Sequence, residues 1–250
     1  MQQRTAIITL LSSIFLLGGC ITTTDGKKPL KAKPKAAAKS YFELGASYMQ
    51  RGRYDLAEPK LQRSIDAYPT AEAYNALALL YEEIHDNLLA EETYEKLLAT
   101  FPDYGRGYLN YNIFLCKYNR TGQIEALAAK MAAQNKEIAA IGQIAAGNCA
   151  FSKGDMTTAA NHYKRALIYE QYAAGALLPL AEIDLQKGFV NEAKEKVDKV
   201  NNYIGYSARS LYLSILINRE LGNRLEERRL MQSLRARFPN SPEARNIFSQ

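Results

Sequence analysis

The side chains of this sequence best suited to chemistry are thiols and imidazoles, and they are few. The 250 residues contain three cysteines, Cys20, Cys116 and Cys149, and two histidines, His85 and His162. Neither histidine has a cysteine or carboxylate at metal-ligand spacing, and the sequence contains no HExxH, GxSxG, P-loop or dinucleotide-binding motif. We therefore predict no catalytic residue, no metal site and no bound cofactor, and we expect both histidines on the surface.

Cys20 lies where a covalent lipid would be attached. Arg4 precedes an apolar run, residues 6–17, which is too short to span a bilayer but is typical of the central region of a signal peptide. The run leads into Leu-Gly-Gly-Cys at residues 17–20, which resembles the lipobox of bacterial lipoproteins, where small residues precede a cysteine that receives diacylglycerol. We expect residues 1–19 to be removed as a signal peptide and Cys20 to carry acyl lipid. A plain secretory signal is the alternative.

Positive charge is concentrated next to this cysteine. The chain has a net charge of +6, and between Ile21 and Lys39 six lysines are set against one acid, Asp25. We expect residues 20–37 to form the lipidated cysteine and a basic flexible leader, solvated or in contact with anionic lipid head groups. The rest of the chain is close to neutral, which argues against nucleic acid as a partner. By resemblance to proteobacterial lipoproteins, the absence of Asp at position 21 implies an outer-membrane protein that faces the periplasm.

The helices expected to hold the remaining cysteines and the histidines repeat with a period near 34 residues. Gly154, Gly188 and Gly222 are 34 residues apart. One stretch has the tetratricopeptide (TPR) pattern almost completely, with Tyr41, Leu44, Gly45, Tyr48, Gly52, Ala57, Leu61 and Pro69. Small residues in this pattern let two helices cross closely, and the second glycine permits the turn between them. We predict an all-α fold, a right-handed superhelical solenoid of about six TPR repeats.

The repeats are expected to occupy residues 38–250. Their approximate bounds are 38–70, 71–104, 105–139, 140–173, 174–207 and 208–241. The third repeat is degenerate, because its second helix drifts out of register around Asn119 to Gly122. In the sixth, Glu227 replaces the small residue of the second helix, which suits a capping repeat whose outer face meets water.

The first helices of successive repeats are expected to line a concave groove, which is where such arrays bind partners. In this register the walls of the first three repeats contain mostly apolar side chains: Phe42, Ala46, Met49, Asn75, Leu79, Glu82, Leu109, Ile113 and Cys116. We predict that this partner-binding groove accepts a segment of another protein. The alternative is that these residues pack against a neighbouring helix or the leader.

Cys116 and Cys149 fall at nearly equivalent positions on the first helices of the third and fourth repeats. Because such helices run roughly parallel, the two α-carbons can lie about 5 to 6 Å apart. We predict a disulfide that cross-links the degenerate repeat to the next one. Closing a loop of about 33 residues would contribute roughly 3 to 4 kcal/mol on the chain-entropy model. The alternative is a pair of buried free thiols.

Three short stretches add a resemblance to a known family. They are YMQRG at 48–52, NYNIFLC at 110–116 and SARSL at 207–211. Together with the lipobox, the basic leader and about six repeats, they resemble the PilF/PilW family of type IV pilus biogenesis lipoproteins, known as pilotins. The cysteine pair resembles the neisserial branch of that family. Asn112 departs from it, because the family commonly has Gly there.

The resemblance implies a function for the whole chain. It implies a monomeric, lipid-anchored scaffold that binds the pilus secretin subunit and helps it to localise and multimerise in the outer membrane, which twitching motility requires. An adaptor for another envelope machine, serving outer-membrane barrel assembly or peptidoglycan synthesis, is the alternative.

Overall fold

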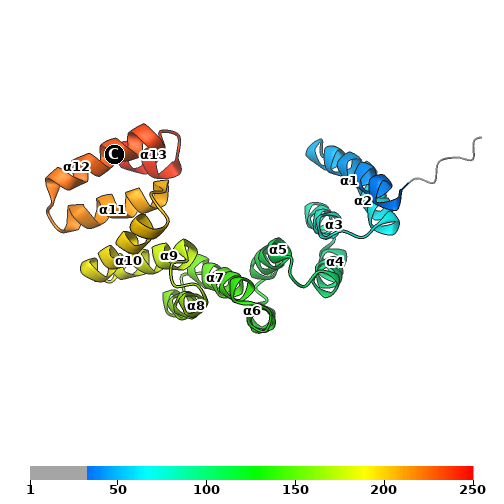
Figure 1. The fold of residues 1–250 in the computed structure, drawn as a ribbon, viewed down its shortest axis with the longest axis horizontal. Coiled ribbons are helices and arrows are strands. Elements are labelled where there is room, and N and C mark those ends of the chain that lie inside the picture. The colour runs from blue at the N-terminus through cyan, green and yellow to red at the C-terminus, as the bar shows by residue number, and fades with distance from the viewer. Residues whose placement is uncertain (1–32, 250) are drawn as a thin grey trace, which may run out of the picture. The chain divides into compact units, whose positions relative to one another are not determined.

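The computed structural model describes residues 33–249, which form thirteen helices joined by short turns and contain no strand (Figure 1). The helices are α1 (Pro34–Gln50), α2 (Tyr54–Ala67), α3 (Ala71–Glu83), α4 (Asn87–Thr100), α5 (Gly105–Lys117), α6 (Thr121–Ala132), α7 (Lys136–Ser152), α8 (Met156–Tyr169), α9 (Ala174–Gln186), α10 (Val190–Tyr203), α11 (Ala208–Glu220), α12 (Arg224–Arg237) and α13 (Pro242–Phe248). The expected signal peptide, the lipidation site at Cys20 and most of the leader lie outside the described residues. No helix within 33–249 combines the length and apolarity needed to cross a membrane.

The first twelve helices pair into six consecutive hairpins. Each odd-numbered helix from α1 to α11 packs on the even-numbered helix that follows it. Neighbouring hairpins are joined through their first helices as well, since α1, α3, α5, α7, α9 and α11 contact one another in succession. This is the stacking of helical hairpins that a period of 34 residues predicts.

The same turn connects the two helices of every hairpin. Its central residue has a positive φ between 57° and 80°, and is Gly52, His85, Asn119, Gly154, Gly188 or Gly222. In the fourth hairpin the next amide, of Asp155, donates to the carbonyl of Ala150 at 3.0 Å, and in the third Arg120 donates to Leu115 at 2.9 Å. Glycine adopts this backbone at no steric cost, and asparagine tolerates it better than most residues. The third repeat therefore keeps the turn, although Asn119 occupies the place of glycine.

The first helix begins earlier than expected. α1 starts at Pro34 rather than near 38, so the last residues assigned to the flexible leader are helical. Proline is well suited to the first helical position, where an amide hydrogen is not needed, and the alanines that follow are strong helix formers. Ala38 is buried, and its carbonyl accepts a 2.8 Å hydrogen bond from Ser64 Oγ on α2. This contact explains why the helix extends toward the leader.

The boundary between the third and fourth repeats also differs from the expected one. α6 has only 12 residues, and α7 begins at Lys136 instead of near 140. Asn135 determines this start, because its Oδ1 accepts from the Ile138 amide at 2.9 Å and so caps the helix. Gly142 lets α7 cross α6 closely, since a Cβ at this position would lie 2.8 Å from the sulfur of Met131. The short α6 and the long α7 together account for the loss of register in this region.

The sixth hairpin shows that one prediction was wrong. Glu227 does not face water: it is 5% exposed, and its carboxylate accepts from Arg219 Nε at 2.8 Å and Arg224 Nη1 at 3.1 Å. The hydrogen bond from Arg219 is the main cause that lowers the pKa of Glu227 below its ordinary value. Two guanidinium groups thus compensate a carboxylate placed where other repeats have a small residue. A short helix that the repeat pattern did not predict, α13, packs Ala244 and Ile247 on α11 and α12.

Candidate protein-binding surface

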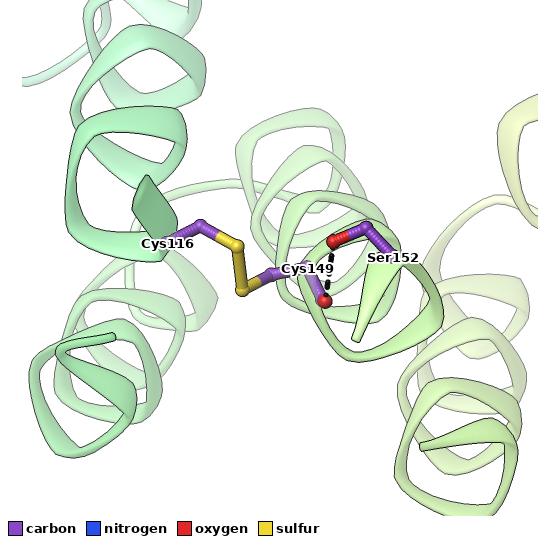
Figure 2. Close-up of a disulfide and its surroundings, with 3 residues drawn as sticks. All are labelled: Cys116, Cys149 and Ser152. Atoms are coloured by element: carbon purple, nitrogen blue, oxygen red, sulfur yellow. Dashed lines mark hydrogen bonds between the residues drawn. A yellow bond between two sulfur atoms is a disulfide. The ribbon is translucent and has the colours of Figure 1, made fainter. Parts of the chain in front are cut away.

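Figure 2 shows the disulfide that joins the third and fourth repeats. Cys116 on α5 and Cys149 on α7 are bonded, with their α-carbons 5.7 Å apart and a sequence separation of 33 residues. On the α7 side, Ser152 Oγ donates a 2.8 Å hydrogen bond to the Cys149 carbonyl (Figure 2). The first helices of two successive hairpins are therefore linked covalently near their carboxyl ends.

The disulfide lines a cavity of about 420 Å³ between these two helices. We call it the α5–α7 pocket. Its apolar side includes Leu109 and Ile113 of α5 and Ala145 of α7, beside both cysteines. Ile113 is 64% exposed and Leu109 is 37% exposed, so both side chains offer apolar surface to a ligand. An apolar cavity with exposed aliphatic walls is the usual form of a subsite that accepts an apolar side chain of a ligand.

The charge on the pocket is all of one sign. Lys117 at the end of α5 and Lys153 just after α7 both line it, and no described carboxylate does. Neither lysine takes part in an ion pair within residues 33–249, although the Lys117 ammonium lies 5.4 Å from the centre of the Tyr118 ring. The pocket therefore presents two ammonium groups, free to attract negative charge, beside an apolar floor.

Asn112 is the polar residue at the base of this pocket. It is 1% exposed, and its Nδ2 has no hydrogen-bond partner in the described part of the chain. It occupies the helix-crossing position that is Gly45 in the first repeat and Gly147 in the fourth. A buried amide that donates to nothing costs free energy; in the described part of the chain, Asn87, Tyr108, Asp184 and Asn201 also have a buried side-chain atom without a hydrogen-bond partner.

The residues predicted to line the groove are placed differently from one repeat to the next. Leu109, Ile113 and Cys116 come together in the α5–α7 pocket. The polar residues of the second repeat are tied to other helices instead: Asn75 accepts from Asn110 Nδ2 at 2.8 Å, and Glu82 accepts from the Tyr94 hydroxyl at 2.6 Å. The remaining apolar residues of the predicted groove are half-buried: Phe42, Ala46, Met49 and Leu79. Two of them, Phe42 and Met49, pack on the hydrophobic core.

Burial is the main cause that raises the pKa of Tyr94, and its hydrogen bond to Glu82 acts in the same direction. The Tyr94 hydroxyl therefore stays protonated and donates to Glu82 at any ordinary pH. The hydrogen bond ties the two helices of the second repeat together. Glu82 is consequently committed to the fold rather than available to a partner.

Sequence reasoning missed the part of the pocket that belongs to the fourth repeat. Asn148 and Lys153 line it, and Asn148 stands 35 residues after Ile113. The third and fourth repeats are related by 35 residues rather than 34, and the cysteine spacing does not reveal this. With a period of 35 at this point, Asn148 would have been assigned to the same surface as Ile113.

The histidines do not form a metal site, and one of them was misplaced. His85 is exposed in the turn of the second hairpin. His162 is 3% exposed, with Nδ1 2.9 Å from Gln143 Oε1 and Nε2 2.9 Å from Glu125 Oε1, so its predicted place on the surface was wrong. Periodicity alone placed it beside the buried Tyr163 but could not show its partners on α6 and α7. Among the described residues, no three His, Cys, Asp or Glu side chains are grouped to hold a metal ion.

Comparisons with known proteins agree with this architecture. Residues 39–71 and 71–104 each match the tetratricopeptide repeat family. The type IV pilus assembly protein PilF of Pseudomonas aeruginosa is 34% identical over 123 residues, which is 48% of this chain and 48% of PilF. The matched segment thus spans about half the length of that relative.

Two solved structures have the same arrangement of helices over most of the chain. A structure of P. aeruginosa PilF aligns with a TM-score of 0.58 and 22% identity, and covers 87% of this chain and 99% of that one. PilW, described as a widely conserved type IV pilus biogenesis factor, aligns with a TM-score of 0.58 and 24% identity, and covers 84% and 97%. The predicted fold, an all-α TPR solenoid, is confirmed, and so is the resemblance to PilF and PilW, because the chain is similar to these two type IV pilus proteins.

Proposed function

We propose that this protein is an outer-membrane lipoprotein that serves type IV pilus biogenesis as a non-catalytic, protein-binding pilotin. In this role it helps the pilus secretin to reach the outer membrane and to multimerise there. The observation that carries the proposal is the 34% identity with PilF over 123 residues. The stacked hairpins support the binding role, because solenoids of this kind present repeated helix surfaces to other proteins.

The α5–α7 pocket is the surface on which we propose that the client binds. Burying a side chain the size of isoleucine is worth roughly 1.5 to 3 kcal/mol, and Ile113 is 64% exposed in the free protein. The disulfide keeps α5 and α7 at a fixed separation, so little ordering is required when a client segment enters. A preformed apolar subsite of this kind suits the capture of an incompletely assembled membrane protein.

Lipid on Cys20 is the second part of the proposed mechanism. Two or three acyl chains on one residue give stable anchoring, because each buried methylene adds about 0.8 kcal/mol. An anchored solenoid remains close to the membrane, which raises its effective concentration near a membrane-bound client. Binding at the pocket can then be weak and still be nearly complete.

A pair of exposed isoleucines provides the test. Ile113→Glu places a charge in the pocket, whereas Ile168→Glu makes the same change on α8, where the side chain is 79% exposed. We expect Ile113→Glu to reduce secretin multimers and twitching to near the level of a deletion strain, and Ile168→Glu to leave both unchanged. Normal multimers and motility with Ile113→Glu would contradict binding at this pocket.

The anchoring step is tested separately. Cys20→Ala should release the protein from the outer membrane and misplace the secretin with it. Co-purification from membranes in a mild detergent then asks whether the secretin accompanies the wild-type protein and is absent with Cys20→Ala. A Cys20→Ala strain with correctly placed secretin multimers would show that anchoring is dispensable.

A further inference from the structure

We infer that the α5–α7 pocket recognises one kind of sequence: an extended segment of a partner protein in which an apolar side chain lies close to carboxylates. The inference rests on the proposed function, because it concerns the same binding surface. It goes further by specifying the chemistry of the segment that binds, which can be tested without the secretin.

The apolar part of the motif follows from the cavity. The apolar lining of this open cavity of about 420 Å³ is formed by Leu109, Ile113 and Ala145 together with the disulfide. These groups can gain free energy only by covering apolar surface, since none of them can donate or accept a strong hydrogen bond. One large aliphatic or aromatic side chain is the ligand group that this space accepts.

The acidic part follows from the two lysines. Lys117, at the end of α5, and Lys153, just after α7, line the same cavity, and no described carboxylate lining it balances them. Both side chains are exposed, so their attraction for a carboxylate acts through water and is screened by salt. Lys117 ends α5 and Lys153 directly follows α7, so both lie at the carboxyl ends of these helices beside the disulfide, and they favour carboxylates close to the apolar ligand residue.

Asn112 supplies a reason for an extended backbone. Its Nδ2 is buried at the base of the pocket without a partner in residues 33–249. The Nδ2 atom is covered in the free protein, so this step requires the Asn112 side chain to turn toward the cavity when a segment enters; a backbone carbonyl next to the apolar side chain would then accept from the amide and remove the cost of the unsatisfied donor. Extended peptides present such carbonyls, whereas a helix uses them internally.

The protein's own leader is a poor occupant of this pocket. Residues 21–39 contain six lysines and one acid, so the leader would bring further positive charge to a surface that already has two lysines. Like charges in proximity oppose binding. The occupant therefore belongs to another polypeptide.

The experiment uses two labelled peptides as probes. One is Glu-Gly-Leu-Phe-Gly-Glu, and the other has lysine in place of both glutamates. The mature full-length chain is held in nanodiscs of neutral lipid, and peptide binding is followed by fluorescence anisotropy. We expect the acidic peptide to bind at least about tenfold more tightly than the basic one, with the difference shrinking as salt is raised.

Charge reversal links this preference to the pocket. The double variant Lys117→Glu/Lys153→Glu should reverse the order of the two affinities, and Lys164→Glu, an exposed lysine on α8, should leave it unchanged. Circular dichroism checks that each variant is folded. Equal affinity for the two peptides, or an unchanged order in the double variant, would overturn the inference.

Anionic lipid is the competing ligand, since a phosphate and an acyl chain could use the same lysines and cavity. Phosphatidylglycerol vesicles offered to the same variants distinguish the two. Vesicle binding that needs Lys117 and Lys153, without binding of the acidic peptide, would show that the site recognises lipid and that the inference is wrong. Secretin multimers and twitching report on the proposed function alone, so a failure of the peptide motif and a failure of the pilotin role are separable.

Discussion

The third and fourth repeats are neighbours, but they place the large and the small residue of the helix crossing on opposite helices. In the fourth, Gly147 on α7 lies against the ring of Tyr163 on α8, and a Cβ on the glycine would be 2.7 Å from that ring. In the third, the equivalent positions are Asn112 and Ala128, so the larger residue has moved to the first helix. The caps differ too, because Asp155 caps α8 through the Thr158 amide at 3.0 Å, whereas Arg120 makes no side-chain cap for α6.

The difference shows how a weak repeat is kept in a solenoid. α5 packs more extensively on α7 than on α6, its own hairpin partner. Neighbours on both sides hold the third repeat: Arg120 and Gln123 bond to Glu91 on α4, and Glu125 bonds to His162 on α8. The disulfide adds a covalent tie. The third repeat is therefore stabilised from outside, and the fourth from within.

Removal of the disulfide is the strongest way to test this contrast. Cys116→Ala/Cys149→Ala should lower the free energy of unfolding by about 3 to 4 kcal/mol, because a loop of 33 residues is no longer closed in the unfolded chain. Urea unfolding measures the loss, and hydrogen exchange should locate it in α5 and α6 before α8. Reduction of the wild-type protein is the matched control and should reproduce the change. Equal loss of protection in all repeats would contradict the contrast.

A pair of alanine substitutions compares the two helix crossings directly. Gly147→Ala forces a methyl group against the buried Tyr163 ring and should cost about 2 kcal/mol after the gain in helix propensity. Asn112→Ala should cost less than about 1 kcal/mol, because the Asn112 Nδ2 makes no hydrogen bond that is lost. Thermal midpoints of the two variants give the comparison. Equal costs would mean that the third repeat is packed as tightly as the fourth.

The turns provide a smaller test with opposite signs. Asn119→Gly should stabilise the protein by roughly 0.5 kcal/mol, since residue 119 has φ 57°. Gly154→Ala, at φ 80°, should destabilise it by about 1 kcal/mol. The two residues occupy equivalent positions in the turns of the third and fourth hairpins, and urea midpoints measure both changes. Two shifts of the same sign would show that the turns are not equivalent.

The smallest effect concerns the tie between α4 and the third repeat. Burial acts to raise the pKa of Glu91, but hydrogen bonds from Arg120 and Gln123 outweigh it, so the net direction is below the ordinary 4.5. A carboxyl group with a lowered pKa in the folded state stabilises that state above its ordinary pKa, and this contribution is lost as pH falls through the lowered value. Wild-type stability should therefore decline below about pH 4.5 more steeply than that of Glu91→Gln. Glu92→Gln, on the exposed side of α4, is the control and should retain the wild-type slope.

Local signals in the sequence were enough for the hairpins, their turns and the cysteine pair. Small residues at the crossings, such as Gly45 and Gly147, repeat at intervals that only a stack of helical hairpins explains. Cys116 and Cys149 could be paired because their sequence separation of 33 residues is close to the period of the repeats.

Contacts between distant helices were not predictable in the same way. Glu227 and His162 looked exposed because their partners lie on other helices, at Arg219 and at Gln143 and Glu125. A shift of one residue turns a side chain by about 100° around a helix, so the uncertain register after the third repeat hid the contribution of α7 to the pocket. α13 follows no repeat and had no periodic signal.

The covalent link between α5 and α7 also determines how the solenoid responds to mechanical load. A pull on a stack of hairpins separates it one repeat at a time, because each repeat contacts only its neighbours. The Cys116–Cys149 bond removes residues 117–148 from the path of the force. That segment would otherwise release about 110 Å of extended chain. An oxidised molecule stretched from its two ends is therefore shorter by this length than a reduced one, and α6 with most of α7 is sheltered from the load.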